Sequence, residues 1–129
     1  MKTEEMKGYV ERAKRGAKYI DEILEAINKK EYLYIGFNGT DRIYCYTKCL
    51  PMGPTFVQDP DNFKEENFFT KSFKEDLNKA EVIVFSSCDI AIKDEITNKL
   101  NSEFTTTPPE IINSIQKPAD FYYTIYFKK

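Results

Sequence analysis

Four small or polar side chains follow the apolar run Val82-Ile83-Val84-Phe85, and their types could bind an anion. They are Ser86, Ser87, Cys88 and Asp89. A buried strand that leads through a polar loop into a helix is where α/β proteins often bind ligands, and helix N-terminal amides favour anions. We therefore expect this turn to be a candidate site for a nucleotide or another small anionic ligand, in a binding protein or in an enzyme. The turn contains no glycine, and the alternative is that Ser87 or Asp89 only caps the next helix.

Catalytic and metal-binding groups are scarce in the chain. It contains no histidine, which excludes mechanisms in which histidine activates serine or a thiol such as Cys88. A closed zinc site needs four ligands, whereas the chain has only three cysteines: Cys45, Cys49 and Cys88. The acidic segment 59–66 lacks the spacing and the glycine of a calcium loop. We predict no catalytic residue, no metal and no cofactor, and favour a protein that is not an enzyme.

Three aromatic segments, 32–37, 43–47 and 121–127, are typical of strands. Alternate side chains of a strand point to opposite faces. A hairpin closed by Gly39 to Asp41 would separate the aliphatic side chains of the first two segments from their tyrosines, and burial favours that register. The last strand adds two tyrosines. The predicted tyrosine face consists of Tyr32, Tyr34, Tyr44, Tyr46, Tyr122 and Tyr126.

An exposed tyrosine face would be suited to binding a partner. Tyrosine combines a large contact area, few rotatable bonds and a hydroxyl group, and it is enriched in binding surfaces. A protein partner is favoured over a nucleic acid, because these strands offer only Arg42 and Lys48 to hold phosphates. One alternative is that the N-terminal helix packs over this face and covers the rings. Another is that the face forms a homodimer.

The elements that would position these residues follow from periodicity. Residues 3–29 are predicted as one helix, because apolar side chains recur at spacings of three and four. The run 82–85 is predicted as a strand buried on both faces. Shorter helices are predicted at 60–67, 73–79, 90–104 and 108–116.

These elements predict one α+β domain over residues 1–129. Its sheet would be mainly antiparallel with about four strands, with the long N-terminal helix and two helices in the C-terminal half. The alternative is a small mixed α/β sheet centred on 82–85.

Composition limits the functional class. The net charge of −2 over 129 residues provides no general attraction to nucleic acid or to an anionic membrane. No apolar stretch reaches the length of a membrane helix, no secretory signal is evident, and an odd, low cysteine count indicates a reducing compartment. We therefore expect a cytoplasmic protein.

The bias of the chain towards Lys, Ile and Asn suggests a bacterial or phage source. The favoured function is binding and inhibition of a partner, as in immunity, antitoxin or phage anti-defence proteins.

Overall fold

The computed structural model describes residues 3–35, 43–52, 68–86 and 94–129. Its elements, in chain order, are α1 (Thr3–Ala26), β1 (Glu31–Ile35), the 3₁₀ turn η1 (Ile43–Cys45), β2 (Leu50–Pro51), α2 (Phe68–Lys79), β3 (Val82–Ser86), α3 (Asp94–Glu103), β4 (Phe104–Thr105), the 3₁₀ turn η3 (Glu110–Ile112) and β5 (Tyr123–Lys128).

The described strands form one mixed sheet in the order β2-β1-β3-β5-β4. β1 runs parallel to both β2 and β3, whereas β5 runs antiparallel to both β3 and β4. The fold is therefore α+β as predicted, but the expectation of a mainly antiparallel sheet of about four strands is wrong. The alternative of a mixed sheet centred on 82–85 agrees with the structure, because β3 is the central strand. Its apolar run without alternation is explained by burial on both faces.

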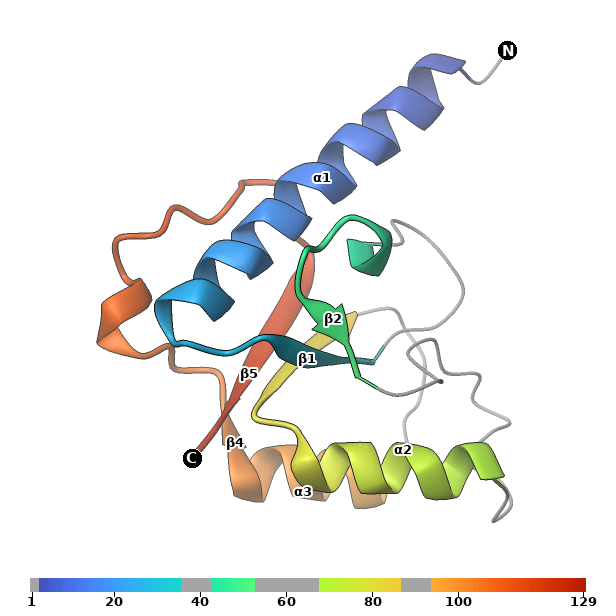
Figure 1. Ribbon diagram of the computed structural model, residues 1–129, viewed down its shortest axis with the longest axis vertical. Coiled ribbons are helices and arrows are strands. Elements are labelled where there is room, and N and C mark those ends of the chain that lie inside the picture. The colour runs from blue at the N-terminus through green and yellow to red at the C-terminus, as the bar shows by residue number, and fades with distance from the viewer. Residues whose placement is uncertain (1–2, 36–42, 53–67, 87–93) are drawn as a thin grey trace.

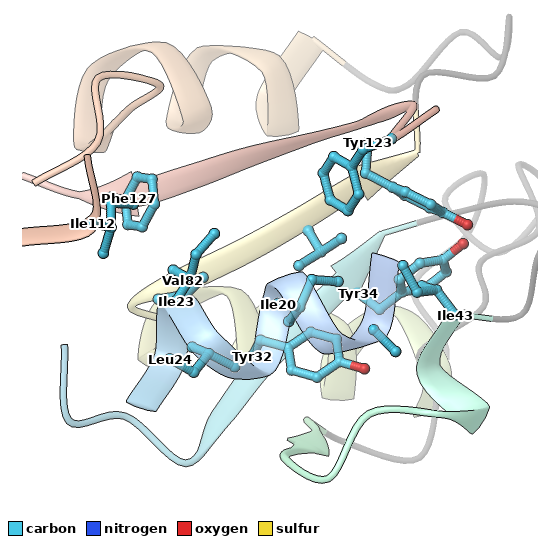
Figure 2. Packing of buried hydrophobic residues seen from close by; sticks show 13 residues of the cluster. Ile20, Ile23, Leu24, Tyr32, Tyr34, Ile43, Val82, Ile112, Tyr123 and Phe127 are labelled. Carbon is cyan, nitrogen blue, oxygen red and sulfur yellow. The ribbon is translucent and has the colours of Figure 1, made fainter. Parts of the chain in front are cut away.

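Helix α1 covers one face of the sheet (Figure 1). Its buried stripe packs against side chains of β1, β3 and β5, and Figure 2 shows this cluster from close by. The stripe predicted from the sequence is the reason for this packing. The helix ends at Ala26 because Asn28 adopts a left-handed backbone conformation with φ of 59°. The backbone N–H of Lys29 then donates to the carbonyl of Leu24 at 2.8 Å, which closes the helix end.

Helices α2 and α3 lie on the opposite side of the sheet from α1 (Figure 1). They bury a second cluster, whose members are Leu33, Ile35, Met52, Phe73, Leu77, Ala80, Ile83, Leu100 and Phe104. Strand β1 contributes to both clusters, since its alternate side chains point to the two covered faces. The sheet is thus the middle layer between two layers of helix.

The predicted hairpin is not formed. Residues 43–45 form the 3₁₀ turn η1 instead of a strand, and the outer neighbour of β1 is the parallel strand β2. Ile43 packs against α1 at Gly16, where a Cβ atom would come within 2.6 Å of the Ile43 Cδ1 atom. This contact holds the segment against α1 and away from the sheet edge. The predicted loop Gly39 to Asp41 lies outside the described residues.

The remaining helix predictions had mixed outcomes. Helix α2 includes the predicted segment 73–79 and begins earlier, and α3 falls within the predicted 90–104. The segment 108–116 forms only the short turn η3, so the helix predicted there is wrong. Residues 60–67 lie outside the described part of the chain. Within the described ranges, no helix has the length and apolar character needed to cross a membrane.

Candidate functional site

The six predicted tyrosines do not share one face of the sheet. Tyr32 and Tyr34 lie beneath α1 and are 0 % and 5 % exposed, as in the alternative in which the N-terminal helix covers them. Tyr126 pairs with Ile83 and packs on the opposite face, with its ring centroid 6.2 Å from that of Phe85. The expectation of a single tyrosine face is therefore wrong in its geometry.

The other three predicted tyrosines lie outside the strands. Tyr44 belongs to η1 and is half-buried against the ring of Tyr34. Tyr46 follows η1, Tyr122 immediately precedes β5, and both are exposed. Of the predicted set, these two are the tyrosines that the structure places where a partner can reach them.

The hydroxyl group of Tyr32 has a structural role. It lies 2.7 Å from the Thr47 Oγ1 atom, and this threonine hydroxyl donates in turn to the Cys49 carbonyl at 2.9 Å. Because the single threonine proton is used in that second bond, Tyr32 is the donor in the first. Burial raises the pKa of Tyr32, so the phenol stays neutral. Tyr32 therefore secures the segment after η1 and does not offer its hydroxyl to a ligand.

Asp21 on α1 secures the same segment. Its two carboxylate oxygens accept hydrogen bonds from the backbone N–H groups of Lys48 and Cys49, at 2.8 and 3.0 Å. Burial and the adjacent Asp21 carboxylate raise the pKa of the Cys49 thiol to about 11. A thiol with a raised pKa is a poor nucleophile at neutral pH.

The pH dependence of alkylation should reveal the raised pKa of the Cys49 thiol. The rate of reaction of Cys49 with iodoacetamide is expected to increase about tenfold per pH unit and to level off only near pH 11, because only the thiolate reacts. Site-resolved mass spectrometry of modified peptides would measure the profile. In urea, the alkylation rate of Cys49 should level off near the ordinary pKa of a cysteine thiol, about 8.5. A native profile that already levels off below about pH 9 would contradict the raised pKa.

The predicted anion site at residues 86–89 can be placed only at its first residue. Ser86 is buried at the carboxyl end of β3, next to the carboxyl end of the parallel strand β1. Ser87, Cys88 and Asp89 lie outside the described residues, and anion binding at this turn stays a prediction. Among the residues that the structure describes, no group of three Cys, Asp or Glu side chains could hold a metal ion.

A second site, not predicted from the sequence, is exposed where α1 extends past the sheet (Figure 1). The Arg12 guanidinium carbon lies 5.2 Å from the ring centroid of Tyr9 and 5.4 Å from that of Tyr122. The two rings are 52 % and 62 % exposed. We call these three residues the tyrosine–arginine patch.

The base of this patch is held by an ion pair. Arg15, one turn further along α1, donates to the Asp120 carboxylate in the segment before β5. The hydrogen bond from Arg15 holds the pKa of Asp120 below its usual value. The pair therefore stays ionised at neutral pH and connects α1 to the segment that carries Tyr122.

No protein-family model, curated protein or solved structure matches this chain. The spacing of Tyr9 and Arg12 on one helix face could have indicated an aromatic–cation pair. Tyr122 lies near the other end of the sequence, and only the tertiary structure brings it to Arg12.

Proposed function

We propose that this protein is a non-enzymatic binding protein, which acts by occupying the surface of a partner protein through the tyrosine–arginine patch. The observation that carries the proposal is the pair of exposed tyrosine rings that flank Arg12. Tyrosine and arginine are the residue types that, with tryptophan, contribute most binding energy at protein interfaces. Here the three side chains also restrict one another before binding, which lowers the entropy lost when a partner docks.

The Arg12 guanidinium at the centre of the patch favours a partner that presents an acidic group there. The absence of histidine from the chain supports binding over catalysis. A protein of this kind would inhibit its target by covering it, as immunity, antitoxin and phage anti-defence proteins do.

The double variant Tyr9→Ala/Tyr122→Ala is expected to weaken partner binding by at least about 100-fold, because hot-spot residues each contribute about 2 kcal/mol or more. The partner is first identified by cross-linking in cells of the source and then purified for calorimetry. Both side chains are exposed, so the free energy of unfolding should change by no more than about 0.5 kcal/mol.

The matched control is Ile111→Ser, which removes another large exposed side chain at η3. This variant should bind the partner like the unaltered protein. Unchanged affinity of the double variant would exclude the patch as the interface, and equal losses in both variants would place the interface elsewhere.

A further inference from the structure

Strand β5 is paired along only part of its outer edge within the described residues. β4 pairs with Phe127 and Lys128, and the chain then reaches Pro108 and Pro109, which cannot donate to a β ladder. The connection from Thr106 to Phe121 turns outward and returns beside α1 (Figure 1). We call this segment the outer connection. It leaves a space between itself, α1 and β5.

A cavity of about 320 Å³ occupies that space. Its lining mixes aromatic and aliphatic side chains with polar groups, among them Thr106, Thr124 and Lys117. The aromatic and aliphatic members are Tyr19, Ile23, Pro108, Ile112, Phe121, Tyr123, Ile125 and Phe127. Three of the lining residues, Ile23, Ile112 and Phe127, come from α1, η3 and β5 and can be followed in Figure 2. This volume falls at the small end of the range of about 300–1,000 Å³ that is usual for small-ligand sites.

A second cavity of about 370 Å³ adjoins the first and is basic. It shares Tyr19 and Lys117 with the inner cavity, and its wall includes Arg15, Lys18 and Glu22. Three cationic side chains therefore line it against one carboxylate, and Arg15 is already paired with Asp120. An anion entering this outer cavity would meet the Lys117 and Lys18 ammonium groups.

The boundary between the two cavities has mixed chemistry. The Lys117 ammonium lies 5.9 Å from the centroid of the Phe121 ring, so charge and apolar surface meet there. The ring of Phe121 also contacts that of Tyr19, with centroids 5.0 Å apart. Burial raises the pKa of Tyr19, which keeps its hydroxyl protonated and able to donate to an anion.

We propose that the two adjoining cavities bind a small amphiphilic anion. Its short hydrocarbon or single-ring body would occupy the inner cavity, and its carboxylate or phosphate head would lie in the outer cavity beside Lys117 and Lys18. The aromatic and aliphatic side chains of the lining provide hydrophobic affinity for the body, and the ammonium groups select the charge of the head. Arg15 lies in the wall of the outer cavity and in the ion pair below the tyrosine–arginine patch, but none of Tyr9, Arg12 and Tyr122 lines either cavity. The proposal therefore holds whether or not the patch binds a protein.

The test is calorimetric titration with four probes that share one chain: octanoate, octyl phosphate, octanol and octylammonium, each below its micelle concentration. Octanoate or octyl phosphate should bind at least tenfold more tightly than octanol, and octylammonium should not bind. The tighter of the two anions identifies the head group as carboxylate or phosphate. Equal binding of the anions and octanol, or no binding of either anion, would overturn the proposal.

Two pairs of variants locate the site. Thr106 is exposed and lines the inner cavity, so Thr106→Trp should block it and lower anion affinity at least tenfold, whereas Thr107→Trp beside it should not. Lys117→Glu should abolish the preference for anions over octanol, whereas the same charge change in Lys14→Glu should preserve it. All four side chains are exposed, and thermal melting confirms folding. Identical behaviour within either pair would place binding elsewhere.

Discussion

Replacing Tyr34 by alanine is expected to lower the free energy of unfolding by about 3–5 kcal/mol. The side chain is 5 % exposed, and its ring centroid lies 5.0 Å from that of Tyr44 and 6.1 Å from that of Tyr123. Truncation removes these ring contacts and leaves a cavity beneath α1. Because domains are commonly stable by only about 5–15 kcal/mol, the variant should lose a large part of its stability. Urea denaturation followed by circular dichroism measures the change.

Tyr46→Ala is the matched control. Tyr46 comes from the same region of the chain, is exposed and follows η1, so its loss should change stability by no more than about 0.5 kcal/mol. The sequence predicts one face for both tyrosines, and the structure separates them. If both variants are equally mild, Tyr34 is not in the core, and the burial described for this strand is wrong.

The sequence predicted the elements whose signals are long or local. The apolar stripe of α1 extends over many turns, and only a helix aligns such side chains on one side. The run 82–85 has no polar position, which identified it as an interior strand, and β3 is indeed central. The alternation of 32–35 correctly grouped Tyr32 with Tyr34, since both lie under α1.

The sequence did not predict which strands pair with one another in the sheet. A short apolar or aromatic run such as 43–47 is compatible with several conformations, and tertiary packing decides among them. Ile43 is buried against Gly16 of α1, and this contact depends on two distant segments. The true neighbour of β1 is the two-residue strand Leu50–Pro51, whose proline is tolerated at a sheet edge but argues against a strand in sequence.

The candidate sites illustrate the same limit. The type and the alternation of Tyr122 predict a binding residue on the same face as the other tyrosines, yet its ring lies against Arg12. The cavity beside β5 depends on how far β4 pairs before Pro108 interrupts it. Neither the Arg12–Tyr122 contact nor the cavity can be predicted from sequence periodicity. Each involves segments that are distant in the sequence and that the order of the strands brings together.

The second large effect is expected on the other face of the sheet, where Phe73→Ala should lower the free energy of unfolding by about 3–5 kcal/mol. Phe73 is 1 % exposed and belongs to the cluster that α2 and α3 bury with Leu33, Ile35 and Ile83. β1 and β3 provide alternate side chains to this face. Loss of the ring would therefore loosen α2 from two neighbouring strands at once. Urea denaturation again provides the measurement.

The control for Phe73 is Glu75→Ala, on the exposed side of the same helix. Alanine has the higher helix propensity, so this change should leave stability within about 0.5 kcal/mol of the unaltered protein. The contrast separates a loss of packing from a change in helix formation. If Phe73→Ala were as mild as Glu75→Ala, α2 would not cover the sheet. Helix α3 would then have to bury Leu33 and Ile83 without α2.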